Sequence, residues 1–215
     1  MSMQTKTYYK VYIYLYVLTV LIIFGARSIL RFDFSTHNIS LLNTVTAQNI
    51  IDALLFAVGP SIILIKIFSM YVWKYSIVKK LLGIDVPYIE GRWEGWLRST
   101  YTKYQQKHDI VIEISQTLTK ISVWYYDVNA VTHSLVSSSI LDETGGTPKV
   151  LCIYDNNPII NNDSGLRRHI GVMELYIMGN EDTIKGTYFN NPTQKKTYGE
   201  MELSLVSRKR LKKFR

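Results

Sequence analysis

The chain has 215 residues, of which 47% are hydrophobic and 20% are charged, and it carries a formal net charge of +8. With 12 glycines, 5 prolines and a mean hydropathy of +0.02, it is neither a disordered nor a collagen-like chain. Its single cysteine, Cys152, excludes an intramolecular disulfide, and the apolar run around this residue indicates a buried, inert thiol.

The net charge is unevenly distributed along the chain. Residues 1–80 hold 8 basic and 2 acidic residues, residues 81–207 hold 11 and 15, and residues 208–215 hold 6 and none. Binding to a polyanion needs many cationic contacts, which the mildly acidic central region does not supply. The distribution therefore disfavours DNA or RNA as a partner and divides the chain into a membrane region (1–80), a globular domain (81–207) and a basic C-terminal tail (208–215).

The first predicted element is a transmembrane helix over Tyr8–Leu30. Its 23 residues would extend ~34 Å as a helix, which is enough for a hydrocarbon core of ~30 Å. Five tyrosines crowd its N-terminal half, as in an interfacial aromatic belt. A cleaved signal peptide fits less well, because the apolar run is long and no small-residue cleavage pattern follows it.

A second transmembrane helix is predicted over Ile50–Trp73, with a basic stop at Lys74, Lys79 and Lys80. Gly59-Pro60 predicts a kink within this span. Basic residues outside the two spans outnumber those in the loop between them, so we expect the N- and C-termini on the cytoplasmic side.

From residue 88 onward the pattern changes to short alternating runs separated by turn residues. The runs are EGRWEGWLRS, HDIVIEIS, TKISVWYYD, VLCIYD, HIGVMELYIM, TIKGTYFN and YGEMELSLVS. Such runs predict antiparallel strands. The expected fold is a small up-and-down β-barrel of about eight strands, with a β-sandwich as the second choice.

The residues that carry enzyme chemistry are not found at diagnostic spacings. There is no glycine-rich phosphate loop, no serine nucleophile elbow and no pair of catalytic carboxylates. The four histidines, at positions 37, 108, 133 and 169, are scattered and give no metal-ligand cluster. We therefore expect neither an enzyme nor a metal site.

The predicted barrel instead combines aromatic and polar side chains in a way that suits a planar, anionic ligand. Aromatic faces stack on bases, and arginine or histidine side chains contact phosphate. Trp93, near the start of the first run, is expected to be a core residue that closes the barrel. Tyr154, His169 and Tyr188 each suit either a packing role or a ligand contact.

The order of several short motifs resembles a known family. They are Gly91-Arg92-Trp93, Ser115-Gln116-Thr117, Ser137-Ser138-Ser139, Tyr154-x-Asn156-Asn157-Pro158, His169-x-Gly171, Gly186-x-Tyr188-Phe189-Asn190 and Gly199-x-Met201. With two N-terminal spans before them, they resemble the two-transmembrane, β-strand-rich effectors of bacterial CBASS antiphage systems, which are associated with a CD-NTase and have a minimal β-barrel domain. The segment from Asn190 to Lys196 differs from the family pattern.

This resemblance implies a cytoplasmic barrel, anchored in the bacterial inner membrane, that binds a cyclic dinucleotide made by a partner CD-NTase. It also implies that binding drives self-association, after which the helices disrupt the lipid bilayer and infection is aborted. No cofactor is expected besides this ligand. The candidate binding residues are Trp124, Tyr154 and Tyr188 for stacking, Arg167, Arg168 and His169 for phosphate, and Asn156, Asn190 and Thr197 for base edges or ribose hydroxyls.

Two other functions remain open on the sequence alone. A membrane-tethered, lipocalin-like carrier would hold a small apolar ligand in a cavity of ~300–1,000 Å³. A structural membrane subunit would have a barrel filled by side chains.

Overall fold

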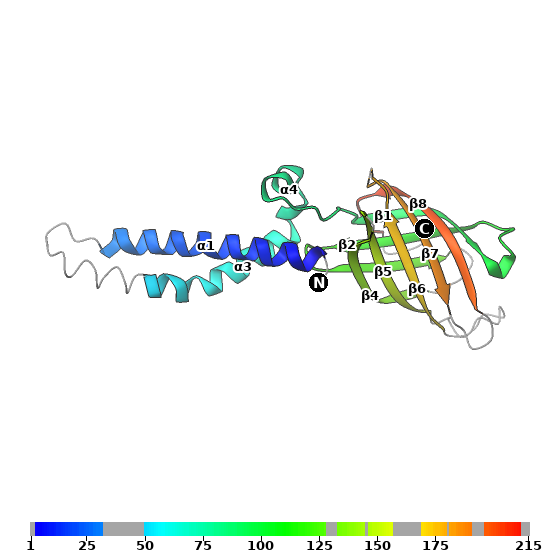
Figure 1. Ribbon diagram of the computed structural model, residues 1–215, viewed down its shortest axis with the longest axis horizontal. Helices are drawn as coiled ribbons and strands as arrows, with labels where there is room; N and C mark the ends of the chain where they lie inside the picture. The colour runs from blue at the N-terminus through cyan, green and yellow to red at the C-terminus, as the bar shows by residue number, and fades with distance from the viewer. Residues whose placement is uncertain are drawn as a thin grey trace. The chain divides into compact units, whose positions relative to one another are not determined.

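The computed structural model describes residues 3–31, 50–127, 133–144, 146–156, 169–179, 181–190 and 196–211. The chain divides into two compact units. Thr5–Ile84 form a helical unit, and Asp85–Arg215 form a β unit that also includes Met1–Gln4 (Figure 1).

The helical unit contains one long apolar helix and a bent pair of shorter ones. Helix α1 spans Met3–Arg31, and within the described residues its segment Gln4–Ala26 is the one unbroken helix long and apolar enough to cross a bilayer. A helix over Ile50–Phe56 and helix α3 (Val58–Met70) meet at 44° and would make a second span only if both halves cross together. The turn η1 (Val72–Lys74) and helix α4 (Ser76–Leu82) follow.

The expected bend is present in the second apolar segment, but its break lies at Ala57 rather than at Gly59-Pro60. Pro60 has no N–H to donate to the carbonyl group of Phe56, and its ring crowds that carbonyl, so the helix opens one turn before the proline. Ser61 resumes the ladder with a 3.0 Å hydrogen bond from its N–H to the Ala57 carbonyl. On the other side of the break, the Tyr16 hydroxyl of α1 donates to the Leu54 carbonyl at 3.0 Å.

The β unit is an antiparallel barrel whose strands are neighbours in chain order. They are β1 (Gly91–Ser99), β2 (His108–Gln116), β3 (Ile121–Asp127), β4 (His133–Thr144), β5 (Thr147–Asn156), β6 (His169–Ile177), β7 (Thr183–Asn190) and β8 (Thr197–Ser207). Strand β8 pairs with β1 and closes the barrel (Figure 1). The prediction of an antiparallel up-and-down barrel is confirmed, and the alternative of a sandwich is wrong.

Period-two alternation decides which side chains fill the barrel. Inward positions include Ile112 and Ile114 on β2, Leu175 on β6 and Leu203 on β8, all of them buried. Outward positions alternate with these along each strand. The apolar runs in the sequence therefore build one core inside the closed sheet.

The end of the barrel where β1 begins is plugged by the segment that leads into this strand. Val86 and Ile89 are fully buried there. Gln116 holds the segment, because its side chain accepts a 2.8 Å hydrogen bond from the Ile89 N–H and donates a 2.9 Å hydrogen bond to the Pro87 carbonyl. The Trp93 indole N–H donates to the Ile89 carbonyl at 3.0 Å, so the prediction that Trp93 closes the barrel core is confirmed.

Cys152 on β5 is buried, as its apolar surroundings predicted, and burial raises the pKa of its thiol to about 12. Because the thiolate is the reactive form, we expect no maleimide labelling of Cys152 in the native chain at neutral pH and complete labelling in urea, as measured by intact mass. The free energy of unfolding should also fall above about pH 9, because there the Cys152 thiol loses its proton in the unfolded chain but keeps it in the native chain. Labelling of the native chain at the unfolded rate would contradict the buried position.

Candidate functional site

Two tyrosine side chains point into the barrel at the end opposite the one that the Val86–Ile89 segment closes. Tyr154 lies near the end of β5, and Tyr188 lies near the end of β7. The Tyr188 hydroxyl donates a 2.8 Å hydrogen bond to the Ser99 hydroxyl at the end of β1. Tyr154 is buried, and this burial, with a smaller contribution from Tyr188, raises the pKa of its phenol. The Tyr154 phenol therefore stays neutral, and both side chains offer a flat face with a polar tip.

Two glycines give these rings their space. Gly171 pairs with Tyr154 across β5 and β6, and Gly199 pairs with Tyr188 across β7 and β8. A Cβ atom on Gly171 would overlap the Tyr154 ring, and one on Gly199 would overlap the Tyr188 ring and the Arg98 carbonyl. The motifs His169-x-Gly171 and Gly199-x-Met201 thus place glycine where each ring lies over the neighbouring strand.

Replacing Gly171 by alanine is expected to cost ~1–3 kcal/mol of stability, because the buried Tyr154 ring must move. Ligand affinity should fall with it if this ring forms part of the site. Gly179→Ala is the matched control, since a Cβ at this glycine meets nothing within 4 Å. Urea unfolding of both full-length variants checks the expectation, and equal midpoints for the two would contradict it.

The structure brings two further predicted residues to the same end of the barrel. The Asn190 side-chain oxygen accepts hydrogen bonds from the Thr197 N–H at 3.0 Å and from the Thr197 hydroxyl. These contacts join the end of β7 to the start of β8. Asn156 and His169 occupy paired register positions at the ends of β5 and β6 that lie beside them. Arg167 and Arg168 lie outside the described residues, in the connection that ends at His169.

Trp124 is the predicted stacking residue that the structure does not bring into this cluster. Its neighbours in sequence, Val123 and Tyr125, occupy inward register positions opposite Ile114 and Ile112, so Trp124 belongs to the outer face of β3. The Arg210 guanidinium carbon lies 4.7 Å from the centre of its ring. Trp124 therefore carries a cation–π contact with the C-terminal segment instead.

That C-terminal segment lies on a buried ion pair on the outer face of the barrel. Arg92 Nη1 lies 3.1 Å from Glu113 Oε1, and Arg92 Nε lies 2.6 Å from Glu94 Oε1. The Leu211 N–H donates to the same Glu113 oxygen at 2.8 Å. Arg208 donates to the Tyr88 and Glu90 carbonyls at 2.8 and 3.2 Å. The first residues of the basic tail thus cover the ion pair, an arrangement that the charge count alone did not predict.

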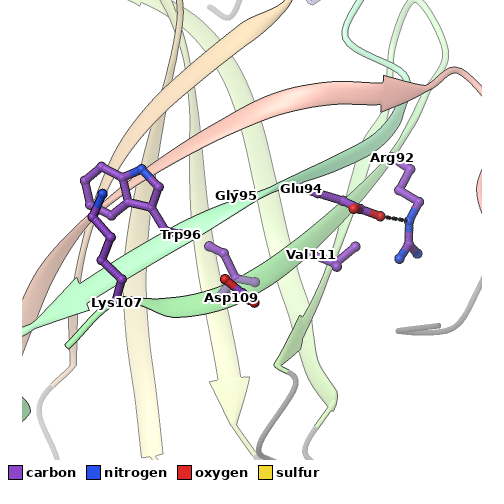
Figure 2. A pocket seen from close by; sticks show the side chains of 8 residues that line it. Arg92, Glu94, Gly95, Trp96, Lys107, Asp109 and Val111 are labelled. Carbon is purple, nitrogen blue, oxygen red and sulfur yellow. Dashed lines mark hydrogen bonds and ion pairs between the residues drawn. The ribbon is translucent and has the colours of Figure 1, made fainter.

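A groove of about 420 Å³ lies on the outer face of β1 and β2. Figure 2 shows Trp96 and Lys107 at one end and the Arg92–Glu94 ion pair at the other. The Lys107 ammonium lies 4.4 Å and the Arg98 guanidinium 5.2 Å from the centre of the Trp96 ring. Because Glu94 and Asp109 line the same groove, its charge is mixed and is less suited to a doubly anionic ligand than a cationic site would be.

Ser99 is a candidate site residue that no sequence pattern predicts. A serine at the last position of a strand has no pattern of its own, and its link to Tyr188 joins residues 89 positions apart. Only strand alternation could have indicated that Ser99 faces inward, because it lies two residues after the inward-facing Leu97. Among the residues that the structure describes, no group of histidine, cysteine or carboxylate side chains is arranged to hold a metal ion.

Comparison with known protein families gives one match. No curated protein matches the chain. The family described as Cap15, cyclic dinucleotide receptor domain, matches residues 84–204, which include the whole barrel except the end of β8. The domain is a receptor for a cyclic dinucleotide in CBASS effectors, as the resemblance predicted. The chain therefore belongs to the family of Cap15 cyclic dinucleotide receptor domains.

Proposed function

We propose that this protein is a membrane-anchored effector of CBASS antiphage signalling that binds a cyclic dinucleotide inside the end of the barrel lined by Tyr154 and Tyr188. Binding drives association of the membrane helices, disruption of the bacterial inner membrane and abortive infection. The observation that carries the proposal is the inward cluster of Tyr154, Tyr188, Ser99, Asn190 and Thr197 within a domain of this receptor family.

The chemistry of the cluster suits the two kinds of group in a cyclic dinucleotide. Each ring of Tyr154 and Tyr188 offers a face on which a base can stack, and such stacking contributes ~1–3 kcal/mol per base. Thr197 and Asn190 supply polar atoms for ribose hydroxyls or base edges. Arg167 and Arg168, which precede β6 in the sequence, and His169, the first residue of β6, supply donors for phosphate oxygens. Trp124 is left out of this proposed site, because it lies on the outer face.

The proposed membrane step uses both apolar segments of the helical unit as a two-span hairpin. Lys6 and Lys10 lie near the N-terminal end of the first span and three lysines follow the second, whereas Arg27 and Arg31 lie at the end of the first span that leads into the connection. This asymmetry supports cytoplasmic termini and a cytoplasmic barrel. The barrel then meets the ligand where a partner CD-NTase would release it. A lipocalin-like carrier is disfavoured by the hydrogen-bonded polar groups at the candidate site.

Growth and dye entry test the effector function in cells. Co-expression of the full chain with an active cyclic dinucleotide synthase should stop growth and admit a membrane-impermeant dye. A chain lacking residues 1–80 should do neither, and the full chain beside an inactive synthase is the control. Dye entry without residues 1–80, or equal dye entry with the inactive synthase, would contradict the proposal.

A further inference from the structure

The outer face of β7 and β8 carries an exposed aromatic surface that the proposed ligand site does not use. Phe189 on β7 is 55% exposed and pairs in register with Tyr198 on β8, which is 58% exposed. The ring centre of Tyr104, from the turn after β1, lies 6.2 Å from that of Tyr198 in an edge-on arrangement. These three residues are called the Tyr198 surface below.

The Tyr198 surface is held firmly by its backbone. The Thr100 hydroxyl donates to the Tyr198 carbonyl and accepts from the Tyr198 N–H, both at 3.1 Å. Since both bonds use main-chain atoms of Tyr198, its side chain is presented outward by a fixed strand. A rigid, pre-organised aromatic surface loses little conformational entropy on association, which favours its use as a contact.

The exposed area is large enough for the centre of a protein interface. A fully buried aromatic side chain removes ~150–250 Å² from water, so these three residues expose on the order of 300 Å². Val172 and Ile153 continue the same register row across β6 and β5, and Ile153 is also exposed. A standard interface buries ~800 Å² per partner around an apolar centre, and this row supplies such a centre.

The Tyr198 surface has one positive and one negative residue beside it, and a two-fold rotation would pair each with the opposite charge on a second copy. Lys196 and Glu200 are both exposed and lie two residues before and two residues after Tyr198. When two copies of β8 meet antiparallel with Tyr198 at the axis, Lys196 of each copy faces Glu200 of the other. An isologous contact of this kind needs one surface that matches itself, and like charges directly opposite would oppose it.

We propose that a second copy of this chain docks on the Tyr198 surface through a two-fold contact between the outer faces of β8. The inference deepens the proposed function, on which it rests, by assigning the surface through which barrels associate. Strand alternation connects this surface with the ligand site, because Phe189 follows Tyr188 and Tyr198 follows Thr197.

Cysteine cross-linking of the full chain in detergent, without ligand, tests this contact. With a short bis-maleimide cross-linker, Tyr198→Cys should form a linked dimer at least ~10-fold faster than Val206→Cys, because facing sheets lie ~10 Å apart and only residues near the axis bring two thiols within that reach. Val206 is the matched control, since it lies on the same strand and is also 58% exposed. Cys152 is buried and adds no background. Equal rates for the two variants would overturn the proposal.

A charge exchange tests the orientation of the contact. In the Tyr198→Cys chain, Lys196→Glu alone should lower dimer formation by about 5-fold, and adding Glu200→Lys should restore it. Failure of the double change to restore it overturns the two-fold arrangement. In a nanodisc that holds one copy, protection of the Tyr198→Cys thiol from maleimide would assign the surface to lipid and also overturn the proposal.

Calorimetry on the same preparations separates this proposal from the proposed function. A panel of cyclic dinucleotides is titrated into the Tyr198→Cys chain. If Tyr198→Cys forms more cross-linked dimer than Val206→Cys but no cyclic dinucleotide gives a heat of binding, the contact between copies stands and the receptor site is contradicted. Normal binding without such a dimer contradicts the contact and leaves the receptor site intact.

Discussion

Replacing Arg92 by methionine is expected to lower the free energy of unfolding of the barrel by ~3–5 kcal/mol, because the change leaves Glu113 buried without its main cation. Arg92 is 3% exposed and Glu113 is 1% exposed. The Leu211 N–H would remain as a donor to the carboxylate, but it carries no full charge. Urea unfolding of the full chain in detergent, followed by tryptophan fluorescence, should show a midpoint lowered by ~2 M.

Two further variants identify the cause of this loss. The double change Arg92→Met and Glu113→Leu removes both charges and should return most of the stability, because a buried ion pair contributes little over apolar residues of similar volume. Glu94→Gln removes the more exposed partner of Arg92 and should cost less than ~1 kcal/mol. A double variant as unstable as Arg92→Met alone would show that lost packing, and not an uncompensated charge, causes the effect.

Replacing Tyr154 by alanine is expected to weaken cyclic dinucleotide binding by ~5- to 150-fold, because one stacked base loses ~1–3 kcal/mol. Tyr188→Phe keeps its ring and loses only the hydroxyl that binds Ser99, so its effect should be smaller. Calorimetric titration of the full chain with the tightest-binding member of a cyclic dinucleotide panel measures both. Urea midpoints are recorded alongside, since Tyr154 is also a core residue.

Tyr176→Ala is the matched control for Tyr154→Ala. Tyr176 is a strand tyrosine on β6, but it belongs to the outer face, where its hydroxyl donates to Glu174 at 2.9 Å. Its removal should leave affinity unchanged. Full affinity in a folded Tyr154→Ala chain, or an equal loss in Tyr176→Ala, would contradict an inward site.

The barrel could be predicted from the sequence because alternation is a local property. Ile110, Ile112 and Ile114 repeat every two residues on β2, and Met201, Leu203 and Leu205 do so on β8. Each alternating run predicts one strand without reference to the rest of the chain. Closing the sheet into a barrel removes its exposed edges. Trp93 and Cys152 were placed correctly in the core for the same reason, since each lies within such a run.

The facing of Trp124 could not be predicted, because its run offers no clear alternation. Trp124, Tyr125 and Tyr126 are three consecutive aromatic residues, so a shift of one position exchanges the inward and outward sets. Pairing with β2 settles the choice, since Ile112 lies opposite Tyr125. The tail contact was also beyond reach, because the Leu211 N–H meets Glu113 across 98 residues of sequence.

Some residues of the candidate site could be predicted from their local sequence, whereas others join it only through contacts between distant parts of the chain. Tyr154 and Tyr188 were predicted because each combines a polar tip with a strand position next to a turn, and Asn190 and Thr197 because their polar groups suit base edges or ribose hydroxyls. The closure of β8 on β1 brings the ends of their strands together. Ser99 joins them only through this closure. The bend in the second apolar segment was predicted from Pro60, whereas the break at Ala57 follows from the bond that proline cannot make one turn earlier.

A structure of the full chain with a bound cyclic dinucleotide would locate the ligand site. We expect the ligand inside the barrel end, with its bases against the rings of Tyr154 and Tyr188 and a polar contact to Thr197 or Asn190. A ligand bound instead in the outer groove beside Trp96 and Lys107, with the barrel end unchanged, would contradict this placement.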